Sequence, residues 1–277
     1  MRLIRRKHRP AGSGGGRLAL LSVLLAFVLA SHTALPAHAN GELKVIDSTD
    51  YPWHSIGRVN RAGYKSVSSC TGTLIAPNLV LTAAHCIVSP KTKQKLPADE
   101  VLFIAGVRRD EYAARLEAEC LLVPDGYVPT GRPSISDIHK DLGLIVLKEP
   151  STLFPLPPLT PDESRRLRQS TRFLSVGYRR SRPYLPTVVS SCSVLGSQED
   201  VWITDCNTES GASGGPLMVN TIFGPRVAAV MSSKINDERS IVVPFPEWQD
   251  LIASASCDRE PGGEAPLTDP DANQQTN

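Results

Sequence analysis

The feature that most constrains the fold of this chain is its division into many short apolar runs, which form two groups on either side of a proline-rich stretch. The first group lies within residues 51–147 and the second within residues 171–243. Short apolar runs bounded by Gly, Pro and Asn are typical of β-strands. Residues 149–170 are predicted to be a linker, with one or two helical turns over residues 162–169. The pattern therefore predicts two all-β barrels or sandwiches, followed by a helix over residues 245–255.

The N-terminus is predicted to be a signal peptide. Residues 1–39 carry six Lys or Arg side chains and no acidic ones, and an apolar run extends from Leu18 to Ala30. The tripeptide Ala37-His38-Ala39 follows, which is a typical cleavage pattern. An uncleaved anchor is the alternative, but the apolar run is short for a membrane span of about 20 residues. Cleavage would leave Asn40 as the first residue, and no membrane partner is expected afterwards.

The charge of the chain is unevenly distributed. Residues 258–277 hold five acidic side chains and one basic one and are rich in Pro, Gly, Asp and Gln, so this tail is expected to be disordered. Residues 40–257 carry 23 basic and 23 acidic side chains. A nucleic-acid binder needs a basic surface that neutralises phosphates. No nucleic-acid partner is therefore expected.

All six cysteines follow the predicted signal peptide. An oxidising compartment would let them form three disulfides, and the sequence alone allows fifteen ways of pairing them. They form no C-x-x-C pair of the kind typical of zinc sites, so no metal is expected. The chain is therefore expected to be secreted or periplasmic. The cysteines are Cys70, Cys86, Cys120, Cys192, Cys206 and Cys257.

One motif offers a nucleophile. Ser213 lies in the sequence G-A-S-G-G-P, whose glycines allow a sharp turn and a close approach of the backbone to a reacting carbonyl. The same G-x-S-x-G pattern occurs at the nucleophile of α/β hydrolases and in Gly-rich turns without function. No histidine follows Ser213, which excludes the order Ser…Asp…His and leaves His…Asp…Ser. Beyond the signal peptide, the candidate bases are His54, His85 and His139.

The stretch from Cys70 to Cys86 resembles the histidine region of chymotrypsin/trypsin-type serine peptidases. Their usual pattern is C-x-G-[ST]-L-I, then a strand and T-A-A-H-C, and this chain reads C-T-G-T-L-I and T-A-A-H-C. The resemblance implies that His85 is the catalytic base and that the two cysteines form a disulfide. His54 is then expected to be a structural residue of the first strand, and His139 a solvated side chain.

Two further motifs follow in the family's order. Asp141 opens D-L-G-L-I-V-L, which is similar to the strand that supplies the triad acid, whereas no apolar strand directly follows the alternative, Asp137. Ser213 lies in a motif similar to the family's G-D-S-G-G-P. The resemblance implies that Asp141 and Ser213 complete the triad, and that the N–H groups of Gly211 and Ser213 form the oxyanion hole. It implies no metal and no cofactor.

The resemblance, which extends over about residues 43–255, also implies the fold. This is an all-β fold of two six-stranded antiparallel β-barrels of chymotrypsin type, with a C-terminal helix. The N-terminal barrel would occupy residues 40–148 with the histidine and aspartate. After the linker at 149–170, residues 171–257 would form the C-terminal barrel and helix with the serine. The implied partner is a protein or peptide substrate, and a monomer is expected.

The chain departs from trypsin at its activation machinery. Ala212 stands where trypsin-like enzymes have the Asp that receives a new N-terminal amine, and no R-I-V-G-G activation site is visible. Residues 204–208 instead resemble the bacterial, glutamyl-endopeptidase-like branch, in which the cysteine before the serine loop pairs with one on an upstream strand. Signal-peptide removal alone is therefore expected to give a competent enzyme. The implied pairs are Cys192–Cys206 and, for the remaining two cysteines, Cys120–Cys257.

The specificity pocket is expected to be neutral. Asn207 stands where trypsins place the Asp that binds Lys or Arg, and Val230 stands near the position of the histidine that Glu-specific relatives use. The chain is thus expected to be a secreted serine endopeptidase. The alternatives are a catalytically inactive homologue that acts as a binding module, and a serine esterase. The predicted pocket residues are Asn207, Thr208, Val230, Met231, Ser232 and Ser233.

Overall fold

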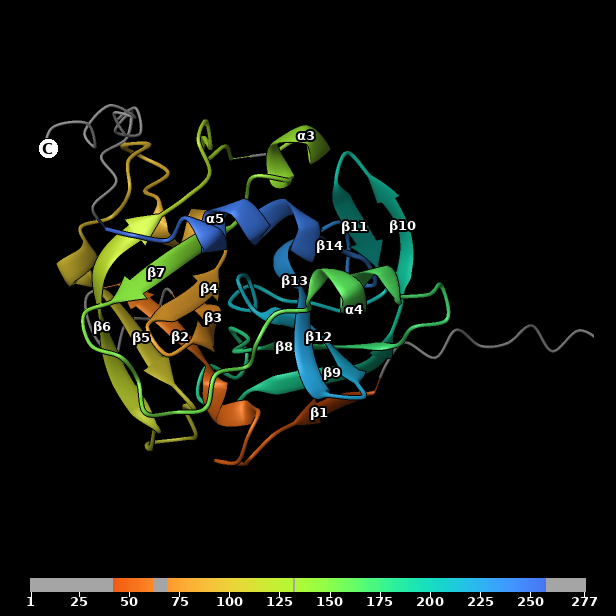
Figure 1. The fold of residues 1–277 in the computed structure, drawn as a ribbon, viewed down its shortest axis with the longest axis horizontal. Helices are drawn as coiled ribbons and strands as arrows, with labels where there is room; N and C mark the ends of the chain where they lie inside the picture. The colour runs from red at the N-terminus through yellow and green to blue at the C-terminus, as the bar shows by residue number, and fades with distance from the viewer. Residues whose placement is uncertain (1–41, 62–68, 132, 258–277) are drawn as a thin grey trace, which may run out of the picture. The chain divides into compact units, whose positions relative to one another are not determined.

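The computed structural model describes residues 42–61, 69–131 and 133–257. The predicted signal peptide (1–39) and acidic tail (258–277) lie outside these residues. Figure 1 shows that the described part consists mainly of strands with a few short helices, which confirms the predicted all-β class. Within the described ranges, no helix is long and apolar enough to span a membrane.

The first group of strands forms a closed six-stranded barrel, as predicted, in the order β2-β3-β4-β7-β6-β5. Each neighbouring pair is antiparallel. The strands β4 and β7 are buried along their whole length, which explains their almost uninterrupted apolar sequences. The bounds are β2 Ile56–Arg61, β3 Ser69–Ala76, β4 Leu79–Thr82, β5 Val101–Ala105, β6 Ala114–Leu122 and β7 Gly143–Leu147.

The second group, together with β1 near the start of the described chain, forms an eight-stranded antiparallel sheet, which differs from the closed six-stranded barrel implied by the resemblance. Its order is β1-β9-β8-β12-β13-β14-β11-β10, so that β1 and β10 are its edges. The bounds are β1 Leu43–Val45, β8 Phe173–Gly177, β9 Thr187–Cys192, β10 Val194–Gln198, β11 Val201–Thr204, β12 Pro216–Thr221, β13 Gly224–Lys234 and β14 Ser240–Pro244.

The edge strand β1 corrects the predicted division of the chain. It lies in the range predicted for the N-terminal barrel, residues 40–148, but pairs with β9, with Leu43 opposite Val189 and Val45 opposite Thr187. A strand can join the edge of a sheet through main-chain hydrogen bonds alone. The side chains of this three-residue strand therefore do not indicate which strand it pairs with.

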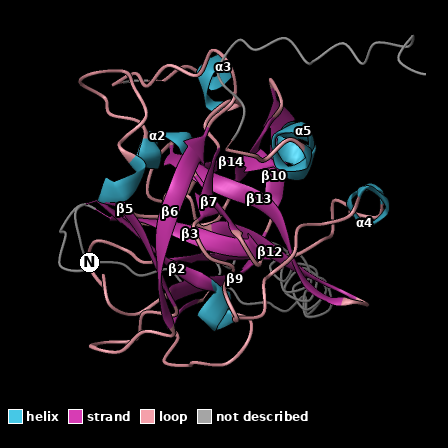
Figure 2. Ribbon diagram, turned by 60° about the vertical axis from the view of Figure 1, so that its left-hand side comes forward, coloured by secondary structure: helices cyan, strands magenta, loops and turns pink. Residues whose placement is uncertain are grey.

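The linker contains the short helix α4 (Pro161–Arg165), near the predicted helical turns. A capping box starts it: the Thr160 hydroxyl accepts from the Glu163 N–H, and the Glu163 carboxylate accepts from the Thr160 N–H. The predicted C-terminal helix is divided into the 3-10 helix η3 (Phe245–Trp248) and α5 (Gln249–Ala253). The other short helices are η1 (Trp53–Ser55), α2 (Ala84–Ile87), η2 (Ala98–Glu100) and α3 (Ile135–Ile138), and Figure 2 shows how the helices surround the strands.

Three disulfides join the pairs that the sequence analysis gave. Cys70 pairs with Cys86 and joins β3 to α2. Cys192, the last residue of β9, pairs with Cys206, which follows β11 and precedes the loop that carries Ser213. The third bridge spans 137 residues, from Cys120 in β6 to Cys257 after α5. It fastens the end of the described chain to the first barrel.

We predict that replacing Cys120 and Cys257 together by alanine lowers the free energy of unfolding by about 2–5 kcal/mol, because the crosslink restricts a long loop in the unfolded chain. Denaturant titration of the purified protein measures this change. As a control, mass spectrometry after alkylation without reduction should find no modified cysteine in the unaltered protein. Alkylation at Cys120 and Cys257 of that protein would contradict the bridge.

Candidate active site

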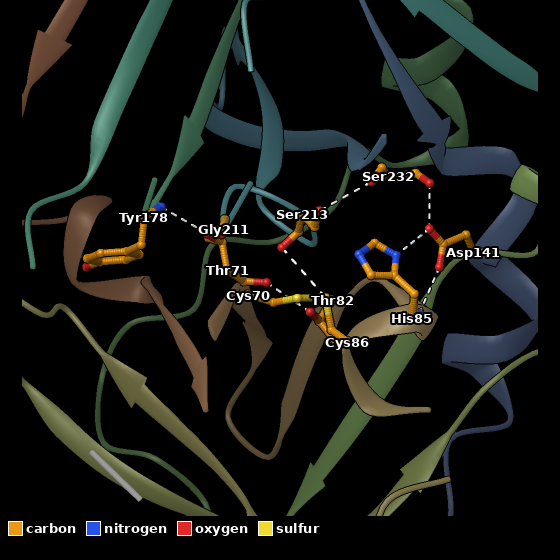
Figure 3. The surroundings of a disulfide bond; sticks show 10 residues. All are labelled: Cys70, Thr71, Thr82, His85, Cys86, Asp141, Tyr178, Gly211, Ser213 and Ser232. Carbon is orange, nitrogen blue, oxygen red and sulfur yellow. Dashed lines mark hydrogen bonds and ion pairs between the residues drawn. A yellow bond between two sulfur atoms is a disulfide. The ribbon is translucent and has the colours of Figure 1, made fainter. Parts of the chain in front are cut away.

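The structure brings His85 and Asp141 into direct contact. His85 lies in α2, just after β4, and Asp141 is separated by Leu142 from the start of β7, which pairs with β4. The His85 Nδ1 atom lies 2.7 Å from Oδ2 of Asp141, and the His85 main-chain N–H donates to Oδ1 at 2.9 Å. These two bonds fix both the position and the orientation of the imidazole, as Figure 3 shows.

A third donor to Asp141 comes from the second sheet. The Ser232 hydroxyl, in β13, donates to Oδ2 of Asp141 at 2.5 Å, and the Ser232 carbonyl accepts the Ser213 hydroxyl at 3.3 Å. Among the described residues, Ser213 forms no hydrogen bond with His85 (Figure 3); such bonds often tighten only when substrate is present. Ser232 was predicted only as a residue of the specificity pocket, and no sequence motif indicates its contact with Asp141.

The site shifts the pKa values of its acid and base in opposite directions. Burial raises the pKa of Asp141, but the charge and hydrogen bonds of His85 and the hydrogen bond from Ser232 outweigh burial and lower it overall. Burial lowers the pKa of His85, but the charge and hydrogen bond of Asp141 raise it above its usual value. Asp141 is therefore ionised at neutral pH and stabilises a protonated His85.

Within the described residues, the N–H groups of Gly211 and Ser213 have no protein acceptor. The Ser210 carbonyl accepts from the Arg180 N–H at 2.7 Å, and the planar peptide therefore directs the Gly211 N–H to the opposite side. Gly211 has a φ of +96°, and a Cβ there would lie 2.4 Å from the Tyr178 carbonyl oxygen, so glycine is required.

Side chains from the first barrel support the serine loop. Thr71, in β3, donates its hydroxyl to the Gly211 carbonyl at 2.7 Å, and its N–H donates to the Ser213 carbonyl at 2.8 Å. The same Thr71 hydroxyl accepts from the Tyr178 N–H at 2.9 Å. Figure 3 shows Thr71 between these groups. This residue thus fixes the loop that carries the candidate oxyanion hole.

A second set of bonds holds the loop from the segment that follows β8. The buried guanidinium of Arg179 donates to the side-chain and main-chain oxygens of Asn207 at 2.9 and 2.6 Å. Ser181 donates its N–H and hydroxyl to the Glu209 carboxylate at 2.8 and 2.7 Å. Ala212 packs against Gly177. A side chain at position 177 would not fit, because its Cβ would lie 2.6 Å from the Cβ of Ala212. The sequence analysis identified neither Arg179 nor Ser181, because these contacts depend on tertiary packing.

His85, Asp141 and Ser213 line a cleft of about 490 Å³. Of the predicted pocket residues, Thr208, Met231, Ser232 and Ser233 line it, whereas Asn207 faces Arg179 and Val230 is fully buried. Thr208 presents a buried hydroxyl with no protein partner among the described residues. Residues 127–130 form another wall of the cleft. Burial and the charge of Asp141 raise the pKa of Tyr127 in this wall, so its phenol is neutral.

The remaining predicted site residues lie as follows. His54, in η1, approaches the carbonyls of Thr49 and Phe154 through its ring nitrogens at 3.3 Å each, in keeping with a structural role. Asp137 accepts from Ser134 in the capping box of α3, so its carboxylate is engaged away from His85. The clusters that bring cysteines near His85 or Asp205 contain disulfide-bonded sulfurs, which cannot act as thiolate ligands for a metal.

Comparison with known proteins identifies the class that this fold and cleft define. Residues 70–221 match the model of the trypsin-like peptidase domain, and the chain belongs to that family. The chain is also similar to a solved structure of a Glu endopeptidase in complex with MPD, with a TM-score of 0.59 and 20% sequence identity. That match covers 77% of this chain and 95% of the other, and supports the chymotrypsin-type fold.

We predict that Asp141→Asn lowers the pKa of His85, because the substitution removes the negative charge while burial continues to disfavour the imidazolium. An NMR titration of the His85 ring would show its transition moving to lower pH. The matched control is Asp137→Asn, which should leave this transition in place. An unchanged His85 transition in Asp141→Asn would contradict the geometry.

Proposed function

We propose that the chain is an exported serine endopeptidase, and that His85, Asp141 and Ser213 hydrolyse peptide bonds through an acyl-enzyme intermediate. The observation that carries the proposal is the pair of N–H groups beside the Ser213 hydroxyl, in a cleft that also contains an imidazole held by a buried carboxylate. Such an arrangement can stabilise the oxyanion of a tetrahedral intermediate. The membership of the trypsin-like peptidase family supports the same reaction.

In the proposed mechanism, Ser213 Oγ attacks the scissile carbonyl carbon while Nε2 of His85 takes the hydroxyl proton. Asp141 holds Nδ1 of the ring and stabilises the imidazolium that forms. The N–H groups of Gly211 and Ser213 bind the oxyanion, and loss of one such donor costs about 3–4 kcal/mol of barrier. His85 then gives the proton to the leaving amine, and water enters by the same route to release the acid.

The cleft favours a substrate side chain without a full charge. Thr208 contributes a hydroxyl that has no hydrogen-bond partner in the described part of the chain, and Met231 and Ser233 contribute apolar and small polar surface. Glu209 and Lys234 also line the cleft, but Glu209 is bonded to Ser181 and Lys234 is paired with Asp237. We therefore propose a neutral specificity pocket in which Thr208 offers the polar contact.

Activation without a second cut is part of the proposal. Val45 pairs with Thr187, and the Ile46 N–H donates to the Pro186 carbonyl at 2.9 Å, so the start of the described chain is engaged on β9. Ala212 offers no carboxylate to an incoming amine. The contacts from Thr71, Arg179 and Ser181 support the loop in place of such an ion pair.

We predict that Ser213→Ala reduces the rate of casein hydrolysis by at least about a thousand-fold while circular dichroism stays unchanged, because the nucleophile alone is removed. Ser210→Ala is the matched control: it alters an exposed serine of the same cleft and should stay within about ten-fold of the original rate. More than a tenth of the original activity in Ser213→Ala would overturn the assignment.

Two further measurements separate the alternatives. A fluorophosphonate probe should label the unaltered protein at Ser213, whereas an inactive homologue would not react. Turnover of casein should exceed that of a short-chain ester, and the reverse preference would indicate an esterase.

We predict that a chain beginning at Asn40 is active as purified, because the serine loop is held by contacts that need no new amine. The N-terminus of the active species is sequenced in the same experiment. Activity that appears only after cleavage near Val45 or Ile46, and that is lost when the new N-terminus is acetylated, would contradict this prediction.

A further inference from the structure

The turn between β12 and β13 exposes two large apolar side chains. Ile222 and Phe223 are 84% and 65% exposed. Single exposed apolar residues are common on soluble proteins, but two adjacent ones at a projecting turn form a concentrated apolar tip. The turn is well defined, since the Thr221 hydroxyl oxygen accepts from the Phe223 N–H at 3.1 Å and lies 3.0 Å from the Gly224 carbonyl oxygen.

The helix α4 is fastened directly to this turn. Glu163 is buried and accepts from the Thr221 hydroxyl at 3.1 Å, and its carboxylate also pairs with Arg226 of β13 at 3.2 Å. Thr160 donates to the same carboxylate through its N–H at 2.8 Å. Figure 1 shows α4 beside the β12–β13 hairpin. The base of the apolar tip is therefore bonded to α4 through Glu163.

Exposed arginines lie at the end of α4 and in the segment that leads from α4 to β8. Residues 165–172 contain four arginines and no acidic residue. Arg165 and Arg166 end α4, and the exposed Arg168 follows, with its guanidinium on the Arg165 and Leu167 carbonyls. Antiparallel pairing places Leu174 of β8 opposite Met218 of β12, so Arg172, just before β8, lies toward the end of β12 that leads into the turn.

These cations have few acidic neighbours to neutralise them. Arg165 pairs with Asp162, but within the described ranges Arg166, Arg168 and Arg172 form no ion pair with a carboxylate. Arg172 donates to the carbonyls of Ser170 and Thr171 instead. We define the basic collar as Arg165, Arg166, Arg168 and Arg172.

We propose that the apolar tip and the basic collar together form a docking surface for an anionic lipid membrane. Ile222 and Phe223 would enter the boundary between headgroups and acyl chains, while the arginines contact the lipid phosphates. A projecting apolar tip fits a fluid lipid surface, which needs no preformed groove, and the arginines supply the second signal that stable association requires. This proposal revises the expectation that the exported chain has no membrane partner.

Docking at the tip leaves the catalytic cleft open. Ser213 lies just before β12, and Met231 to Lys234 end β13, so the cleft is at the opposite end of the same hairpin from Ile222 and Phe223. With a rise of about 3.3 Å per residue, five or more residues of strand separate the two ends by at least about 17 Å. The membrane-bound protein would therefore still admit a peptide.

The test measures partition of the purified exported protein onto vesicles of phosphatidylcholine and phosphatidylglycerol in a ratio of about 2:1, and onto vesicles of phosphatidylcholine alone. The variant Ile222→Ser/Phe223→Ser should reduce the partition coefficient on anionic vesicles by at least about ten-fold. Its matched control is Ile235→Ser, an apolar side chain that is 50% exposed just beyond the far end of β13. This control should bind as the unaltered protein does.

The electrostatic part is tested by Arg166→Gln/Arg168→Gln/Arg172→Gln, which should weaken anionic-vesicle binding by about five-fold for each arginine removed. Its control, Lys91→Gln/Lys95→Gln/Lys148→Gln, removes the same charge elsewhere and should have little effect. Melting temperatures check that every variant is folded.

Several results would overturn the proposal. They are absence of binding to anionic vesicles, equal binding to both vesicle types, and binding that the tip variant does not weaken. Binding of an acidic synthetic peptide at the tip, without binding to vesicles, would instead identify a protein partner and would equally refute the lipid assignment. None of these results depends on peptidase activity.

Discussion

The buried carboxylate of Asp141 is the constraint on which the rest of the site depends. Removing an aspartate from water is costly unless hydrogen bonds satisfy its oxygens. Here His85 provides two donors from the first barrel, and Ser232 provides a third from the second sheet. The hydrogen bonds to Asp141 therefore hold the barrel and the second sheet at a fixed distance. Because Ser232 also accepts the Ser213 hydroxyl, the same contacts place the Ser213 loop beside the imidazole.

The serine loop is held from both sides without the carboxylate that trypsin-like enzymes place next to the serine. Thr71 holds its main chain from the first barrel, while Arg179 and Ser181 hold it from the segment after β8. The Arg179 guanidinium is buried, which lowers its pKa. It is stabilised there by donating to two oxygens of Asn207. The loop is thus held by several neutral and charge-assisted hydrogen bonds rather than by a single ion pair at position 212.

The sequence predicted the features that local motifs encode. The histidine and aspartate regions, the serine turn and the strand-rich pattern each occupy a few consecutive residues. The roles of Ser232 and Arg179 were not predictable, because both depend on partners that meet only in the tertiary structure. The pairing of β1 with β9 was missed for a related reason, since an edge strand of three residues joins through main-chain bonds. Asn207 was placed in the pocket by position alone, but Arg179 draws its side chain away.

The neutral total charge gives no sign of the arginines near the β12–β13 turn. Residues 40–257 have equal numbers of acidic and basic side chains, which argued against a nucleic-acid partner. The net charge of the chain does not show where like charges are clustered, however. The seven arginines between residues 165 and 182 are balanced by acidic residues elsewhere in the sequence. Arg179 and Arg180 bond to the serine loop, whereas Arg165 and Arg166 end α4, which contacts the β12–β13 turn through Glu163. Because a field from exposed charges falls off within about 10 Å in salt, the local group of arginines, not the neutral total, determines what approaches the tip.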